Sequence, residues 1–326
     1  MSNGIRILGG GPAGASAAIA ALREGRGALV IEKSRFPRHK VCGEFLSPEI
    51  LSTLDQLGVA SGFGALQPAR VRRFSLHFPS SEKSCPLPET AYGLSRFRFD
   101  ELLLEEAVRL GARVTAEATD DESSPRVVAY GRKFAPPKGN RLFGFKAHFE
   151  GPTDDAVELY FFAGCYVGIN PIEGGLTNVC GIGPETALKA RDFEIDEVLD
   201  GFAPLSRRLR PLTRSMKWLM TGPLEFRNRL RVPIEEGRYP AGDALSFVDP
   251  FTGTGILSAV VTGRLAGIAA ARRLRTDEYL GQCRRCLQTP FLASSIFRGV
   301  LARGWADRLA RFVPGAWLVR VTRPQV

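Results

Sequence analysis

The hydrophobic pattern of the first 32 residues predicts a strand, a helix and a second strand in close succession. Residues 5–8 read Ile-Arg-Ile-Leu, an alanine-rich run then continues to Glu24, and residues 28–32 read Ala-Leu-Val-Ile-Glu. Three consecutive glycines separate the first strand from the helix. This order of elements predicts a βαβ unit whose helix begins at a glycine turn.

The glycine turn has the spacing that binds a dinucleotide. Gly9, Gly11 and Gly14 occupy the three glycine positions of G-x-G-x-x-G. They permit a tight turn, a close approach of backbone to a pyrophosphate, and close packing of helix on strand. The free N–H groups of the helix start favour an anion. Glu32, at the end of the second strand, is placed to accept hydrogen bonds from a ribose. The unit alone does not decide between NAD and FAD.

The middle of the chain predicts a second domain built from antiparallel strands. Period-two segments cover 142–149, 157–162, 166–172 and 176–182, with glycine turns between them. Further segments are expected as a helix over 48–57, short strands over 67–90, a helix from an Asp100 N-cap to Arg109, strands at 113–115 and 127–132, helices near 195–202 and 204–209, and strand pieces near Trp218 and Arg231-Val232.

A second glycine turn lies near the C-terminal end of this pattern. Gly242-Asp243 is followed by Pro250 and by Gly253-Thr254-Gly255-Ile256, and an alanine-rich helix continues to Leu274. Arg264 interrupts that helix, so we expect it to be buried within the protein rather than to span a membrane.

Composition excludes several classes of function. The net charge of +10 comes without basic runs interleaved with aromatic residues, so nucleic-acid binding is not expected and a solvated basic surface is favoured. Three histidines form no metal cluster, and the pair Cys283 and Cys286 is expected to be structural. The six cysteines and the absence of a visible signal peptide predict a cytoplasmic protein with reduced thiols.

Three ordered segments together carry a family resemblance. They are 9–35, the Arg96-Phe97-Arg98-Phe99-Asp100 stretch before a helix, and 242–256. With these segments the chain resembles the FAD-dependent oxidoreductases of the para-hydroxybenzoate hydroxylase-like fold, which include group A flavin monooxygenases and the geranylgeranyl reductase family.

The resemblance implies an α/β fold, α+β overall, with three parts. A Rossmann-like FAD-binding domain is expected from 1–68, 92–134 and 229–276, and an inserted antiparallel β-sheet substrate domain from 69–91 and 135–228. A helical C-terminal segment would follow over 277–326.

The resemblance also implies FAD as cofactor and NAD(P)H as external reductant. Glu32 would face the adenosine ribose, Asp243 the ribityl hydroxyls, and 253–256 the flavin N1–O2 edge, where a helix start stabilises negative charge. The Cys42-Gly43-Glu44 stretch would lie beside the isoalloxazine, although packing is the favoured role of Cys42. The expected cofactor contacts are Gly9, Gly11, Pro12, Ala13, Gly14, Glu32, Lys33, Arg35, Cys42, Gly43, Arg96, Gly242, Asp243, Pro250, Gly253, Thr254, Gly255 and Ile256.

The alternation of 144–149 puts Lys146 and His148 on the face opposite Phe145, Ala147 and Phe149. Lys146 and His148 are therefore candidate substrate contacts, as are Tyr166 and Asn170, and a solvated outer face is the alternative. No catalytic residue and no metal ligand is assigned.

The expected activity is that of a monooxygenase (hydroxylase) on a small hydrophobic or aromatic molecule in specialised metabolism. The alternatives are reduction of an isoprenoid C=C bond, as in geranylgeranyl reductases, and non-catalytic flavin binding. Halogenation is disfavoured because residues 166–171 lack the Trp-x-Trp-x-Ile-Pro pattern of the halogenase relatives. Tyr130-Gly131-Arg132 stands where many relatives have an Asp-Gly turn, which weakens the expectation that this turn handles NAD(P)H directly.

The basic amphipathic segment 291–318 could lie on an acidic membrane, cover the substrate domain or form a dimer face. The sequence does not decide the oligomeric state.

Overall fold

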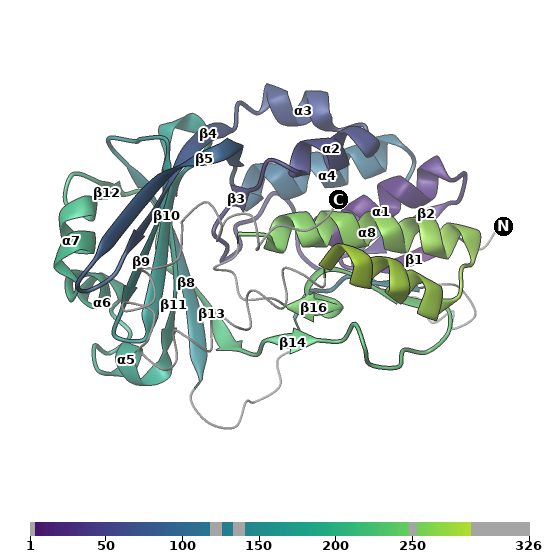
Figure 1. Cartoon of the computed structure of the whole chain (residues 1–326). Helices are drawn as coiled ribbons and strands as arrows, with labels where there is room; N and C mark the ends of the chain where they lie inside the picture. Colours follow the sequence, from purple (N-terminus) through teal and green to yellow (C-terminus); the bar gives the residue numbers. More distant parts are fainter. Residues whose placement is uncertain (1–3, 118–125, 133–140, 248–252, 288–326) are drawn as a thin grey trace.

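The computed structural model describes residues 4–117, 126–132, 141–247 and 253–287. Two large sheets, one parallel and one mainly antiparallel, organise these residues, and a third sheet has only two strands (Figure 1). The predicted fold class, α/β with a Rossmann-like part and an antiparallel sheet, is confirmed. Pro250 and the segment 291–318 lie outside the described residues.

The parallel sheet carries the first glycine turn. Its strand order is β15 (Arg238–Pro240), β7 (Arg126–Val128), β1 (Ile5–Leu8), β2 (Ala28–Ile31) and β6 (Arg113–Thr115). The helices of this half are α1 (Pro12–Arg23), α2 (Ile50–Gln56), α3 (Ala60–Ala65), α4 (Arg96–Arg109), α8 (Gly255–Arg272) and a helix over 276–287. The carboxyl ends of β1 and β7 meet at the glycine turn, because Leu8 pairs with Val128.

The second sheet has nine strands and forms the other half. Its order is β12 (Thr213–Arg214), β8 (Leu142–Glu150), β11 (Thr177–Pro184), β10 (Cys165–Pro171), β9 (Ala156–Phe162), β4 (Ala69–His77), β5 (Glu82–Gly93) and β3 (Phe45–Leu46), and β13 (Leu219–Leu224) also pairs with β8. The four strands predicted between 142 and 182 are confirmed. All neighbours pair antiparallel except β4 and β9.

Three short helices cover one face of the nine-stranded sheet (Figure 1). They are α5 (Glu185–Lys189), α6 (Ile195–Asp200) and α7 (Ala203–Leu209), and they pack on Phe145, Ala147 and Phe149. The opposite face, with Lys146 and His148, faces the parallel half. The side-chain alternation expected for 144–149 is therefore confirmed.

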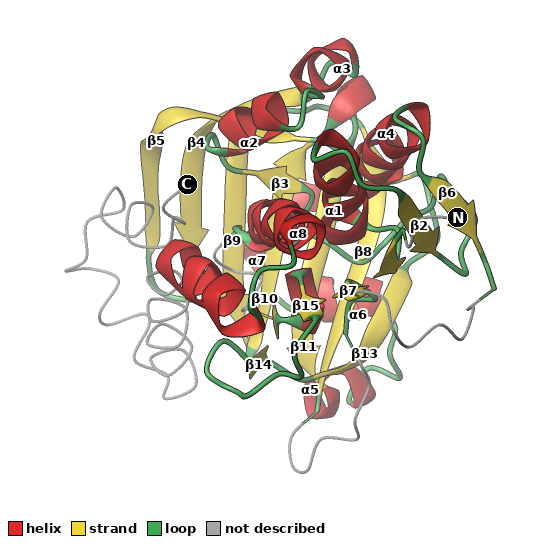
Figure 2. Ribbon diagram, turned by 90° about the vertical axis from the view of Figure 1, so that its right-hand side faces the viewer, coloured by secondary structure: helices red, strands yellow, loops and turns green. Residues whose placement is uncertain are grey.

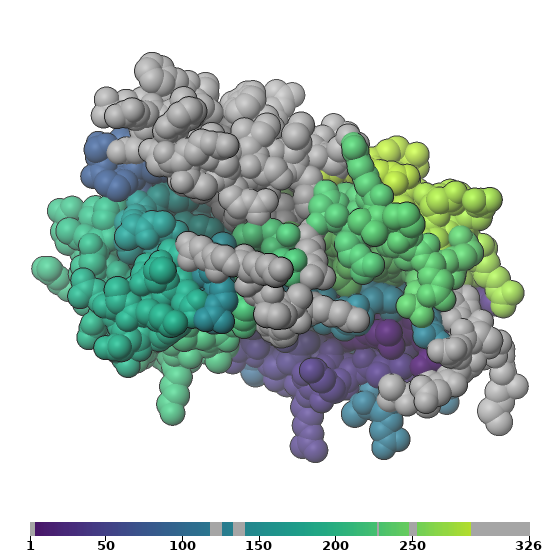
Figure 3. Space-filling model, turned by 90° about the horizontal axis from the view of Figure 1, so that it is seen from below, coloured from purple at the N-terminus to yellow at the C-terminus, as the bar shows by residue number. Residues whose placement is uncertain are grey.

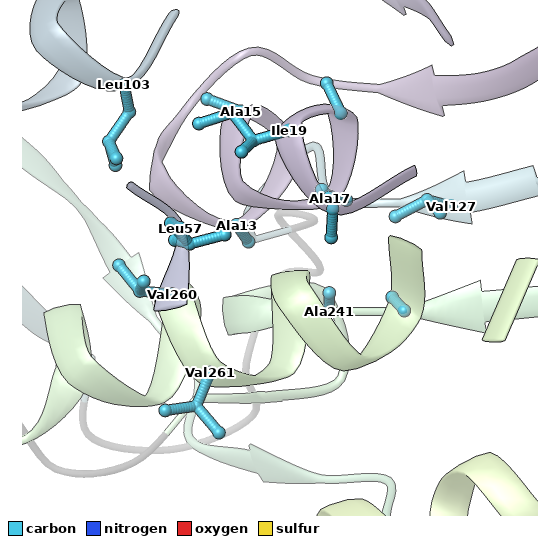
Figure 4. Close-up of a cluster of buried hydrophobic side chains, with 14 of the residues drawn as sticks. Ala13, Ala15, Ala17, Ile19, Leu57, Leu103, Val127, Ala241, Val260 and Val261 are labelled. Atoms are coloured by element: carbon cyan, nitrogen blue, oxygen red, sulfur yellow. The ribbon is translucent and has the colours of Figure 1, made fainter. Parts of the chain in front are cut away.

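Helices α1 and α8 cross at very short range (Figure 2). A Cβ atom added to Gly263 would lie 2.1 Å from the carbonyl oxygen of Ala13, and one added to Gly267 would lie 2.2 Å from that of Ala17. Figure 4 shows Ala13 and Ala17 on the side of α1 that faces α8. Helix α8 is long and apolar enough to cross a membrane by composition, but 61% of it is buried inside the protein. The two glycine turns are thus held together by their own helices.

The structure corrects three expectations about local structure. Helix α4 begins after Ser95, whose Oγ accepts a hydrogen bond from the N–H of Arg98, so Asp100 is not the N-cap. Asp100 lies one turn further on, where it is buried and pairs with Arg96. Arg231-Val232 lies in a turn, and the strand there is β14 (Arg227–Asn228), which pairs with β16 (Ser246–Phe247). Residues 67–90 form two long strands rather than short ones.

Candidate functional site

One cavity of about 590 Å³ joins the two glycine turns. Gly11 from the first turn and Gly253 from the second both line it, together with residues of β8 to β11 on the nine-stranded sheet. Figure 3 shows the purple and green parallel half beside the teal sheet, seen from below. The cavity therefore lies between the halves and reaches the sheet face that the short helices leave uncovered.

Most of the predicted cofactor contacts line this cavity. They are Gly9, Gly11, Pro12, Ala13, Glu32, Lys33, Cys42, Gly43, Arg96, Gly242, Asp243, Gly253, Gly255 and Ile256. Three of the predicted contacts do not line the cavity. Gly14 and Thr254 are buried, and Arg35 is exposed to solvent. The direct binding of a cofactor by each residue stays a prediction.

The first glycine turn has the shape of a phosphate cradle. A Cβ atom on Gly14 would lie 1.7 Å from the carbonyl oxygen of Gly9, and Gly9 itself has a φ of 105°. A Cβ atom on Gly11, in contrast, would meet only Nη2 of Arg96, 3.9 Å away. The first turn of α1 carries no acidic residue, and no side chain caps it. The space in front of this helix start therefore suits an anion.

Glu32 is fixed at the far side of the cradle. Its Oε2 accepts a hydrogen bond from the N–H of Gly10 (2.8 Å) and its Oε1 one from the N–H of Ser34 (2.7 Å). Burial opposes ionisation, but these two N–H groups and Arg38 lower the pKa of Glu32. The carboxylate is therefore ionised and keeps further lone pairs for a ribose diol.

Cations gather beside the cradle. Arg96 is held by Asp100, with 2.7 Å between Nη2 and Oδ2, and Arg38 lies 3.6 Å from Glu32 and 3.8 Å from Asp100. Lys40 also lines the cavity, and its pKa is lowered by burial and by the neighbouring Arg38 and Arg96. This arrangement matches the charge of a pyrophosphate.

The second glycine turn presents an acid to the same cavity. Asp243 follows Gly242, whose φ is 58° and whose N–H donates to Oγ1 of Thr262 (2.9 Å). Nε of Arg132 lies 3.7 Å from Oδ2 of Asp243. Enclosure raises the pKa of Asp243, and the nearby cations oppose that rise. The geometry places a hydroxyl-binding carboxylate between the cradle and the sheet.

Two of the four candidate substrate contacts do not reach the cavity surface. The Lys146 ammonium forms an ion pair with Oε1 of Glu44, and Nε2 of His148 lies 2.7 Å from Oε2 of Glu44. Glu44 lines the cavity and covers Lys146 and His148, whose exposed fractions are 0% and 4%. They are neither solvated nor placed to touch a substrate directly. Tyr166 and Asn170 do line the cavity.

The Cys42-Gly43 stretch is tied to the sheet by Asn178. Nδ2 of Asn178 donates to the carbonyl oxygens of Cys42 (3.2 Å) and Gly43 (2.9 Å). Since both carbonyls point at the sheet and trans peptide groups are planar, the N–H groups of Gly43 and Glu44 point away from it. The N–H of Glu44 lies 3.5 Å from Sγ of Cys42. This stretch is therefore a fixed part of the wall.

The sheet side of the cavity is largely apolar. Its side chains come from β4, β5, β9, β13 and the short strand β16, and they are Phe74, Leu87, Val157, Leu159, Leu219, Met220, Leu224 and Phe247. Met220 and Tyr130 line the cavity and are also about two-fifths exposed to solvent. The described residues hold no cluster of metal-ligating side chains. The cavity thus has a polar half and an apolar half.

Sequence reasoning did not assign Arg38, Arg132 or Asn178 to the site, and it placed Glu44 beside the cofactor only as part of the Cys42-Gly43-Glu44 stretch. Arg38 belongs to the basic run after Glu32, so its residue type was visible, but the turn that brings it back to Glu32 was not. Glu44 meets the side chains of β8, and Asn178 of β11 meets the carbonyl oxygen of Gly43, only because β8 and β11 pair beside the 42–44 stretch.

Comparisons with known proteins agree with this geometry. A model of an FAD-binding domain family matches residues 4–126. Menaquinone reductase of Mycobacterium tuberculosis is 28% identical over 305 residues, covering 80% of this chain and 74% of that protein. Digeranylgeranylglycerophospholipid reductase of Thermoplasma acidophilum is 26% identical over 328 residues, covering 85% and 80%.

Solved structures share the fold. Flavin-dependent brominase Bmp2 superposes with a TM-score of 0.79 at 17% identity, covering 98% of this chain and 92% of that one. A geranylgeranyl bacteriochlorophyll reductase-like protein of Thermoplasma acidophilum gives 0.70 at 20% identity, covering 98% and 91%. Together with the paired glycine turns, these matches show that the chain has an FAD-binding domain and the para-hydroxybenzoate hydroxylase-like fold of FAD-dependent oxidoreductases.

Proposed function

We propose that the protein is an FAD-dependent reductase that saturates a carbon–carbon double bond in an elongated hydrophobic, isoprenoid-type substrate. The observation that carries the proposal is the apolar half of the cavity, which continues to the surface at Met220 and Tyr130. Because the lining reaches solvent, an elongated substrate can extend out of the cavity at this point. The reductases among the relatives, which act on menaquinone and on digeranylgeranylglycerophospholipid by their names, support this substrate class.

In this proposal one set of residues binds the cofactor and another set binds the substrate. Gly11, Glu32 and Asp243 would hold FAD, which supplies hydride when bound. The apolar side chains of β4, β9 and β13 exclude water from the reacting carbons and align the chain. NAD(P)H is proposed as the external reductant.

The proposal is tested with the flavin reduced under strict exclusion of oxygen. We expect added prenylated quinone to reoxidise the flavin and to gain two hydrogen atoms in its isoprenoid chain, located by fragment-ion mass spectrometry, whereas reduction to the quinol would place them on the ring. Substrate that leaves the reduced flavin unchanged without oxygen would overturn the proposal. Reduction of the flavin by NADPH or NADH, followed by absorbance, identifies the electron donor separately.

Monooxygenation is the second candidate, and the apolar side chains of Phe74 and Leu159 in the cavity lining favour it, because a small aromatic substrate packs against such side chains. It predicts that product forms only with oxygen present and gains one oxygen atom. FAD binding without turnover under either condition would instead identify a non-catalytic flavin-binding protein.

A further inference from the structure

An ion pair is buried in the cavity wall where stability alone does not require one. Glu44 and Lys146 are both 0% exposed, and they join the 42–44 stretch to β8. Removing two charges from water costs several kcal/mol per ion, and such a pair is often no more stabilising than apolar residues of the same size. Its position at the cavity therefore calls for a functional reason.

The carboxylate of Glu44 is held in one place from three sides. Besides Lys146 and His148, the N–H of Arg96 donates to Oε1 at 2.6 Å. Glu44 also has a φ of 53°, a strained value for a residue other than glycine. Burial opposes ionisation, but His148 and Lys146 lower the pKa of Glu44. The wall thus contains a permanent anion in front of a buried cation.

This anion lies beside the second glycine turn, which would hold the redox-active part of the cofactor. Glu32 would hold the adenosine ribose at the first glycine turn, and Arg96 lies between the first turn and Glu44, because its side chain approaches Gly11 and its N–H donates to Glu44. A Cβ atom on Gly253 would lie 2.9 Å from Phe45, the residue after Glu44. A dinucleotide that starts at Glu32 must therefore extend toward the second glycine turn and Glu44.

We propose that Glu44 and Lys146 act on the redox potential of the bound flavin with opposite signs, so that Glu44 screens the flavin from the buried charge of Lys146. Reduced flavin carries negative charge, so an uncompensated Lys146 stabilises it and an uncompensated Glu44 destabilises it. As a pair, they leave the ring in a nearly neutral field. The proposal concerns the cofactor alone and holds whichever substrate the protein acts on.

The test is the midpoint potential of protein-bound FAD, measured by spectroelectrochemistry without substrate. Four other titratable groups lie near Glu44 and Lys146. They are His148 on β8, His39 beside His148, Cys42 and Cys180. Each variant is therefore compared with the wild type at the same pH.

Opposite shifts are expected. Glu44→Gln raises the reduced-to-oxidised ratio about tenfold at a fixed solution potential, which is about 30 mV for a two-electron couple. Lys146→Met lowers the ratio by a similar factor. The double variant returns close to the wild-type potential, because the two charges are removed together.

Glu158→Gln is the matched control. Glu158 is also a buried acid on this sheet, with 2.7 Å between its Oε1 and Nε of Arg208, but it does not line the cavity. It is expected to lower the melting temperature without moving the potential. Shifts of the same sign in both single variants, or none beyond that of Glu158→Gln, overturn the proposal. Should Glu44→Gln not fold, Lys146→Met decides alone, and an unchanged or raised potential overturns it.

Discussion

Gly11→Ala is expected to lower the affinity for FAD by about tenfold to a hundredfold, roughly 1.4–2.8 kcal/mol, while the protein folds normally. Gly11 has a φ of −71°, which alanine adopts without strain, and the added methyl would have only Arg96 within 4 Å. That methyl would project into the cradle where the pyrophosphate approaches the backbone. Fluorescence titration of apoprotein with FAD and the melting temperature of the apoprotein measure the two effects separately.

Gly14→Ala is the matched variant, and it is expected to lose both stability and FAD. Its methyl would lie 1.7 Å from the carbonyl oxygen of Gly9, and backbone cannot yield as a flexible side chain can. Normal FAD binding by Gly11→Ala would contradict the assignment of the first turn as the phosphate site. A Gly14→Ala protein with the wild-type melting temperature would contradict the close approach of α1 to β1.

The glycine turns were predictable from sequence because their requirements are local. Gly9, Gly242 and Gly253 need positive φ values within their own turns, and Gly14 makes its close approach to the carbonyl oxygen of Gly9 in the same strand–turn–helix unit. Alternation likewise gave the faces of 144–149, since the side-chain period of a strand is fixed. The shared cavity followed from the pairing of two such turns in one chain.

Long-range partners were not predictable in this way. Glu44 contacts Lys146 and His148 across more than a hundred residues of chain, so neither strand periodicity nor local spacing indicates the contact. From sequence alone the two cations were equally suited to touch a substrate or solvent. Only the register of β8 and β11 beside the 42–44 stretch places an acid over them.

Local sequence signals gave wrong predictions of secondary structure where tertiary contacts decided the outcome. Asp100 is of a residue type that favours the N-cap, but it lies inside the helix, where it binds the guanidinium of Arg96. The N-cap is Ser95, whose Oγ accepts a hydrogen bond from the N–H of Arg98. The prolines of residues 67–90 predicted short strands. Pro86 and Pro88 lie in β5, whose free side pairs only at one end with the two residues of β3. Proline is tolerated on such an edge because no ladder bond is lost there.

Asp243→Ala is expected to weaken FAD binding by about tenfold to a hundredfold, because hydrogen bonds to a charged acceptor contribute about 1.5–3 kcal/mol. Asp243 lines the cavity between the two glycine turns, and Thr262 fixes the preceding Gly242. The loss should appear as a higher dissociation constant and as free flavin after gel filtration.

Asp243→Asn separates hydrogen bonding from charge. Asparagine keeps one acceptor oxygen in the same place, so we expect it to retain more FAD than alanine does. Loss of the carboxylate also leaves Arg132 without its partner and makes the cavity more positive, which alone would favour an anionic cofactor. Tighter FAD binding in both variants would therefore mean that Asp243 acts on charge and not on hydroxyl groups. Asp55→Ala, which removes an exposed acid on α2, controls for net charge and should leave the dissociation constant unchanged.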